Sequence, residues 1–165
     1  MRLIETPAEL YAHAIAIERE AAERYCELAE RMADEGREDL ARLFDLLARE
    51  EAEHLEALER RTSGIALPEI GADPYKWLDA GAPETAAREL IYRLMTPRQA
   101  LAIALRAEQR AQAFFEHVYW TSFDTALRSL AGEMAAEERE HAALIGRMLS
   151  DTPDETLGST LIFER

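Results

Sequence analysis

Apolar residues recur at steps of three and four positions in four separate stretches of the chain. This spacing is typical of helices that bury one face and expose the other. We therefore expect helices at about 7–35, 37–62, 97–120 and 125–149. Four amphipathic helices that must cover one another's apolar faces predict an all-α fold, with the helices packed as a bundle.

Two of these helices have recognisable start signals. Thr6-Pro7-Ala8-Glu9 and Thr96-Pro97-Arg98-Gln99 each place a Thr before a Pro, with a Glu or Gln three residues after the Thr. This is the capping-box pattern with Pro in the first turn. Gly36 is expected to end the first helix, because glycine favours the left-handed conformation found after helix C-termini.

The stretch between the second and third helices has a different composition. Residues 63–96 are broken repeatedly by helix-breaking residues. These are Pro68, Gly71, Pro74, Gly81 and Pro83. The stretch is far longer than an ordinary helix–helix loop and is long enough to cross the length of a bundle. We expect a crossover at 63–96 that contains a short helix at 84–95, and a tail at 151–165, all within a single domain of 165 residues.

Charge and cysteine content narrow the functional classes. The chain carries 33 acidic and 19 basic residues, a net charge of −14, which disfavours nucleic acid and anionic membranes and attracts cations. Cys26 is the only cysteine, so one chain makes no iron–sulfur cluster, zinc–thiolate cluster or internal disulfide. We expect a cytoplasmic protein without a membrane partner, since no signal-peptide pattern and no apolar run of about 18 residues occurs.

The two halves of the sequence repeat each other. Thr96 follows Thr6 by 90 residues, and Glu108 follows Glu18 by the same interval. The string Glu-Glu-x-Glu-His occurs at 50–54 and again at 137–141, 87 residues later. This self-similarity indicates a duplicated pair of helices.

Each apolar stripe is interrupted near its middle by acidic or imidazole side chains. Residues three apart share a face of a helix, so each Glu-x-x-His pair offers an oxygen and a nitrogen to one point. The interrupting residues are Glu18 in the first helix, Glu51 and His54 in the second, Glu108 in the third, and Glu138 and His141 in the fourth.

These polar positions are also expected to lie at one height in the bundle. Glu18 precedes Gly36 by 18 residues and His54 follows it by 18, so the two meet when the helices pair, about 25 Å from the turn at 1.5 Å per residue. Glu108 and His141 are likewise centred on the predicted turn near Asp124. Four buried carboxylates need compensation, and two divalent cations balance them while the histidines stay neutral. The sequence therefore predicts a two-metal site, with iron or manganese favoured and zinc as a possible substitute.

Three further residues have two interpretations each. Glu50 and Glu137 either belong to the solvated face of their helices or accept hydrogen bonds from the ligand histidines. Tyr25, one stripe step from Glu18, either hydrogen-bonds a ligand carboxylate or only packs in the core.

On these six residues the chain resembles the ferritin-like di-iron superfamily, and within it the rubrerythrin-like branch. The resemblance implies a ferritin-like four-helix bundle of two antiparallel hairpins, with the long crossover between the second and third helices. It also implies that Glu51 and Glu138 bridge two iron ions. Glu18 with His54, and Glu108 with His141, would complete one metal each.

The sequence departs from its relatives in ways that bear on activity. A single cysteine cannot form the rubredoxin-like cluster of rubrerythrins, so a separate electron donor is expected. Ala111 stands where rubrerythrins carry an extra Glu used in peroxide reduction. No Met occurs between residues 37 and 61, so the haem of bacterioferritins is not expected.

The resemblance implies a non-haem di-iron, or di-metal, oxidoreductase whose metal ligands are its catalytic residues. It would reduce O₂ or H₂O₂ or oxidise Fe(II), and we expect a homodimer. The alternative is a metal-binding bundle without turnover, which serves in iron or zinc storage, in sensing or in partner binding. A metal-free structural bundle is a third possibility.

Overall fold

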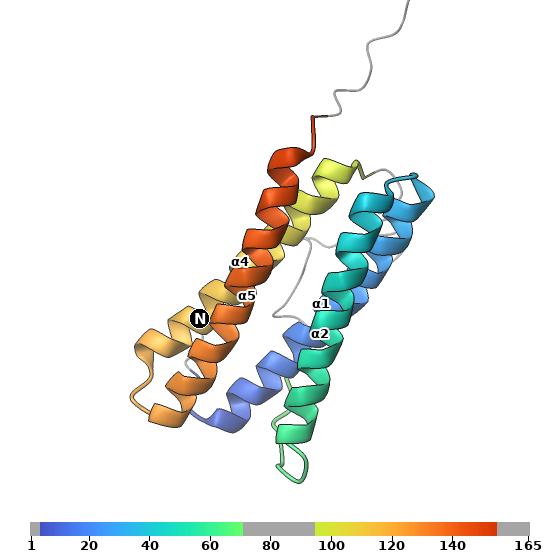
Figure 1. Cartoon of the computed structure of the whole chain (residues 1–165). Helices are drawn as coiled ribbons and strands as arrows, with labels where there is room; N and C mark the ends of the chain where they lie inside the picture. The colour runs from blue at the N-terminus through green and yellow to red at the C-terminus, as the bar shows by residue number, and fades with distance from the viewer. Residues whose placement is uncertain (1–3, 71–94, 155–165) are drawn as a thin grey trace, which may run out of the picture.

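The computed structural model describes residues 4–70 and 95–154, and all regular structure in these ranges is helical (Figure 1). The helices are α1 Pro7–Asp34, α2 Glu38–Arg61, α4 Pro97–Thr121 and α5 Thr125–Asp151. The predicted all-α bundle is confirmed for the described residues. The predicted short helix at 84–95 lies almost entirely outside them, as does the end of the expected tail.

The ends of the helices follow the sequence signals. Thr6 accepts a hydrogen bond from the backbone N–H of Glu9 at 3.2 Å, and the Glu9 carboxylate accepts one from the backbone of Thr6 at 3.3 Å. Thr96 and Gln99 repeat this arrangement at the start of α4. Gly36 has a φ of +72°, so the chain leaves α1 in the left-handed conformation that glycine adopts without strain.

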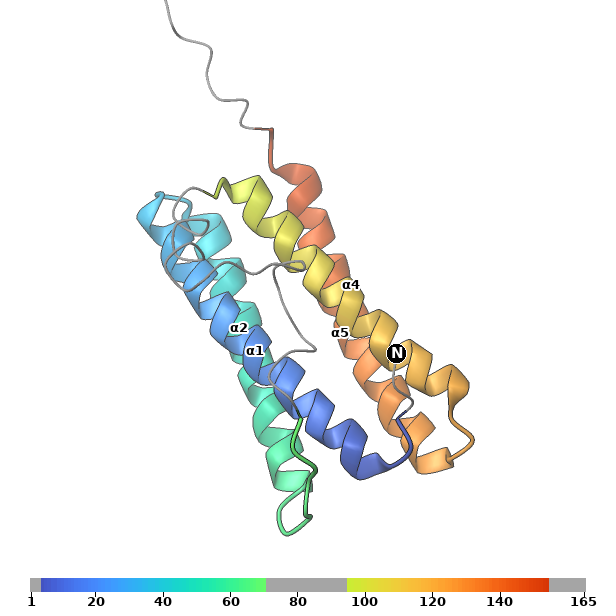
Figure 2. The same cartoon turned by 180° about the vertical axis from the view of Figure 1, so that it is seen from behind.

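The helices pair in chain order. α1 and α2 lie side by side, joined by residues 35–37, and α4 and α5 lie side by side, joined by residues 122–124 (Figures 1 and 2). α1 also contacts α4 and α5, which brings the two pairs together. Each pair therefore presents the inner stripes of two helices to the other pair.

The apolar core is divided into two clusters by a polar layer. One cluster centres on Tyr25, Phe44 and Leu101, and the other on Phe115 and Met134, all of them fully or almost fully buried. On every helix the polar stripe residues fall between the segments that belong to the two clusters. The apolar clusters on either side hold the four helices in register around this layer.

Candidate metal centre

The six residues predicted to bind metal lie together in the polar layer. Five of them are almost completely buried, with exposed fractions between 1% and 7%. The sixth, His54, has a side chain that is 27% exposed. The buried five are Glu18, Glu51, Glu108, Glu138 and His141.

Their donor atoms form two groups that share one carboxylate. Glu51, Glu108, Glu138 and His141 each offer an atom within 4.8 Å of the others, and Glu18, Glu51 and His54 do the same. Glu51 belongs to both groups. Each group contains one imidazole, and the side chains come from all four helices.

Both histidines turn their Nδ1 atoms toward the carboxylates. Nδ1 of His141 lies 2.8 Å from Oε1 of Glu51 and 3.7 Å from Oε2 of Glu108. Nδ1 of His54 lies 3.7 Å from Oε2 of Glu18 and 3.8 Å from Oε2 of Glu51. The imidazole rings stack on each other, with centroids 5.6 Å apart and planes inclined by 15°.

Several donor atoms at this point are buried and have no hydrogen-bond partner. Buried polar atoms in folded proteins nearly always have one, so a concentration of exceptions calls for a ligand. The 2.8 Å approach of His141 to Glu51 does not satisfy either atom, because the hydrogen-bond geometry is not met. The atoms are Oε2 of Glu18, Oε1 of Glu51, Oε1 of Glu138, and Nδ1 of both His54 and His141. The residues therefore fit a metal site.

Without metal, the electrostatics of the site are strained. Burial raises the pKa of Glu18 and of Glu138 well above the usual carboxyl value, and neighbouring carboxylates, Glu51 and Glu108 respectively, raise it further. The pKa of Glu51, in contrast, is lowered. Burial opposes its ionisation, but close contacts with Glu18 and the two histidines lower its pKa to about 2. These shifts favour the protonated form of Glu18 and Glu138 and the charged form of Glu51.

The two histidines also hold protons when no metal is bound. Contacts with the carboxylates of Glu18 and Glu51 raise the pKa of His54 to about 10. Burial lowers the pKa of His141, but Glu108 and Glu51 outweigh burial and raise it to about 11. Two imidazolium groups therefore balance part of the negative charge when no cation does. A divalent ion would take over this role only by displacing their protons.

Tyr25 contacts this layer directly. Its hydroxyl donates a hydrogen bond to Oε1 of Glu108, and its side chain is fully buried. The ring packs against Phe44 with the centroids 6.0 Å apart. Of the two interpretations of Tyr25, the contact with a predicted ligand carboxylate is present.

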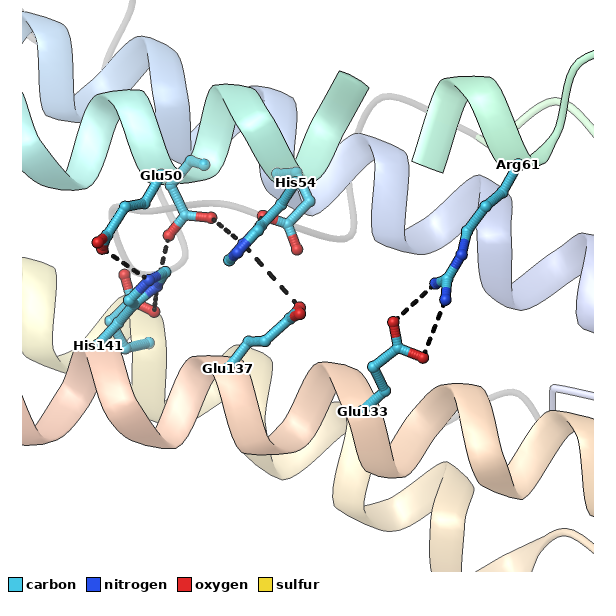
Figure 3. Close-up of polar contacts among 9 residues, drawn as sticks. Glu50, His54, Arg61, Glu133, Glu137 and His141 are labelled. Atoms are coloured by element: carbon cyan, nitrogen blue, oxygen red, sulfur yellow. Dashed lines mark hydrogen bonds and ion pairs between the residues drawn. The ribbon is translucent and has the colours of Figure 1, made fainter. Parts of the chain in front are cut away.

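Glu50 and Glu137 lie where α2 faces α5 (Figure 3). Oε2 of Glu50 is 3.3 Å from Nε2 of His141, the ring nitrogen that points away from the buried carboxylates. Oε2 of Glu137 is 3.9 Å from Nδ1 of His54. Partial burial raises the pKa of Glu137. Both side chains therefore contact a histidine that is predicted to bind metal, but they approach different ring nitrogens.

One contact between α2 and α5 could not be predicted from the sequence. Arg61 on α2 and Glu133 on α5 form a two-point ion pair, with N–O distances of 2.8 and 3.2 Å (Figure 3). No spacing rule connects two residues on helices that are distant in the chain. The pair nevertheless joins α2 to α5 along the same line of contact as His54 and Glu137.

None of the helices within residues 4–70 and 95–154 is long and apolar enough to cross a lipid bilayer.

Comparisons with known proteins agree with this architecture. The family model described as Rubrerythrin matches residues 9–149. The chain is also similar to the crystal structure of an uncharacterized conserved protein from Magnetospirillum magnetotacticum MS-1, with a TM-score of 0.82 and 33% sequence identity. That match covers 93% of this chain and 99% of the other. A search of curated proteins finds no match to the chain.

Proposed function

Since the chain belongs to the rubrerythrin family, we propose that its polar layer binds two iron ions and that the protein is a non-haem di-iron oxidoreductase. The predicted ferritin-like fold and the rubrerythrin-like affiliation are confirmed by the family match and by the similar crystal structure. Manganese or zinc is a possible substitute for iron in the same donor set. No haem and no iron–sulfur cluster are part of the proposal.

The observation that carries the proposal is the cluster of unpartnered donor atoms. Five buried oxygen and nitrogen atoms without hydrogen bonds belong to the six predicted ligands. Each is an atom type that binds iron, and each faces its neighbours within the same layer. A purely structural bundle would leave these atoms unsatisfied in its core, at a cost of about 1–3 kcal/mol for each.

The proposed ligand roles follow from the two groups. Glu51 would be a bridging ligand, which its membership of both groups supports. Glu138 would be the second bridge, as the family resemblance implies. Glu18 with His54, and Glu108 with His141, complete one metal each. Both histidines would bind through Nδ1 in the neutral form, and the Tyr25 hydroxyl would hold the orientation of Glu108.

Iron bound at this site supplies two electrons, one from each Fe(II), for the reduction of O₂ or H₂O₂. The chain contributes the environment of that reaction. Its four buried carboxylates balance the charge of two divalent ions, and the apolar clusters on either side exclude water from the layer. The protons consumed must enter from solvent, and His54 is the most exposed of the six residues. We propose that a separate protein returns the electrons, because Cys26 is the only cysteine.

The test is oxidation of iron in the loaded protein. Metal-free protein is loaded anaerobically with two equivalents of Fe(II), then mixed with H₂O₂ or O₂ while ferric absorption and oxidant consumption are followed. We expect rapid oxidation of both irons, with about one H₂O₂ consumed per pair. Glu138→Gln should abolish the rapid phase, whereas Glu140→Gln, the same change at an exposed position of α5, should preserve it.

Two results would contradict the proposal. Iron that binds but oxidises no faster than free Fe(II) would leave a metal-binding bundle for storage or sensing. Failure to bind iron would reject the metal site as well.

A further inference from the structure

We infer that Glu137 supplies a seventh protein ligand, a carboxylate for the metal position formed by Glu18, Glu51 and His54. This inference rests on the proposed function, because it concerns the same two-metal site. The six expected ligands do not include Glu137, and its neighbour Glu138 is the residue expected to bridge.

Glu137 approaches the ring nitrogen of His54 that would bind the metal. Donor atoms of one divalent ion lie about 2.0–2.2 Å from it, so any two of them are at most about 4.4 Å apart. Oε2 of Glu137 is 3.9 Å from Nδ1 of His54, almost the same distance as Oε2 of Glu18 at 3.7 Å and of Glu51 at 3.8 Å. Three carboxylates therefore approach the single ring nitrogen that faces the metal position. Glu137 is not part of the group whose donor atoms all lie within 4.8 Å of one another, so its carboxylate has to move inward to bind the same ion as Glu18 and Glu51.

Buried polar atoms without hydrogen-bond partners lie at that point. Glu18 is 1% exposed, and its Oε2, the atom that faces His54, has no hydrogen-bond partner. Nδ1 of His54 is also buried and has no hydrogen-bond partner. Glu137 thus extends toward a pair of buried donor atoms that lack a ligand.

The symmetry of the two halves of the chain is broken at Glu137. Glu50 and Glu137 occupy matching positions, each one residue before a predicted bridging Glu. Glu50 lies against Nε2 of His141, where it can only accept a hydrogen bond from a metal-bound ring. Glu137 lies against Nδ1 of His54, the ring nitrogen that also faces Glu18 and Glu51 (Figure 3). The two residues therefore have different roles.

The surroundings of Glu137 are consistent with a role as a metal ligand. The group around His141 has four residues, all of them buried, whereas the group around His54 has three, of which His54 is partly exposed. Glu137 would add a third carboxylate to the two in the group around His54. The Glu137 side chain is 33% exposed, so it is not fully enclosed in its present position.

The experiment is a titration of metal-free protein with Co(II), followed by calorimetry and by the visible spectrum, which responds to coordination. Glu137→Gln removes the charged ligand, Glu137→Asp keeps the charge but shortens its reach, and Glu140→Gln removes an exposed charge from the same helix. We expect two Co(II) ions per chain in the parent and in Glu140→Gln. In Glu137→Gln one of the two binding steps should weaken by about tenfold or more, with a changed spectrum, and Glu137→Asp should also bind more weakly.

The outcomes separate this inference from the proposed function. If Glu137→Gln binds both ions within threefold of the parent with an unchanged spectrum, Glu137 is not a ligand. If Glu137→Asp matches the parent and only Glu137→Gln binds more weakly, Glu137 acts through its charge alone, and the inference is equally wrong. A parent that binds no Co(II) would instead refute the two-metal site itself.

Discussion

Loading the metal-free protein with two divalent ions is expected to release protons. The structure sets a minimum for the number of protons released. The pKa values of His54 and His141 are raised to about 10 and about 11, so both rings are fully protonated at pH 7 in the absence of metal. Each must lose a proton before Nδ1 can bind an ion. One proton from each ring gives a minimum of two per chain. Burial also raises the pKa values of Glu18 and Glu138, which sets the maximum at four.

Calorimetric titration with Zn(II) or Co(II) in buffers of different ionisation enthalpy measures this number. The slope of the observed heat against the buffer's ionisation enthalpy gives the protons released per ion. We expect two to four per chain near pH 7, and an affinity that increases with pH until the histidines are deprotonated in the metal-free state. Saturation with two ions and release of less than one proton would refute the reasoning, because it would mean that the histidines are already neutral.

The same pKa shifts predict how the stability of the metal-free protein depends on pH. Each histidine binds its proton more tightly in the folded state, so its favourable contribution is complete below the unfolded pKa of about 6.5. It is lost as pH increases toward 10 and 11. Chemical denaturation should therefore show the metal-free protein losing stability above about pH 6.5. The metal-loaded protein should not share this loss.

Three substitutions and one removal of metal extend these tests. Glu51→Ala removes the carboxylate common to both groups and should lower the bound-metal count below two; unchanged metal content would refute its bridging role. Tyr25→Phe deletes the buried donor to Glu108 and should cost the metal-free protein about 1–3 kcal/mol in denaturant unfolding, so an unchanged midpoint would mean that the bond contributes nothing. Phe44→Ala leaves a cavity beside Tyr25 and should cost about 3–5 kcal/mol, with metal stoichiometry retained in the folded fraction. Chelation of metal from the parent should lower its melting temperature, because metal binds only the folded site; identical melting curves with and without chelator would contradict this.

Local chemistry explains why the helices could be read from the sequence. The capping boxes at Thr6 and Thr96 satisfy backbone N–H groups within three residues, so their geometry depends on neighbours in the chain. The apolar stripes have one helical period, and the interruptions by Glu and His are visible against them. Observed helix bounds lie within two residues of those expected from the stripes. The six site residues converge because their distances from the turns agree to within about one helical turn.

Contacts between helices from different halves were harder to predict. Nothing in the spacing shows that Tyr25 reaches Glu108, 83 residues away, although its place on the stripe left that contact open. The different roles of Glu50 and Glu137 depend on which ring nitrogen each meets, and that depends on side-chain rotation at the seam between α2 and α5. A repeated sequence alone predicts equal roles. The structure shows where the repeat is broken.

Metal content per chain tests the account most directly. Protein purified without chelators, or reconstituted anaerobically with Fe(II) and desalted, should contain two metal ions per chain by elemental analysis. Glu51→Ala should contain fewer. Near-zero metal after reconstitution of a correctly folded parent would contradict the central claim that the buried carboxylates and imidazoles form a two-metal site.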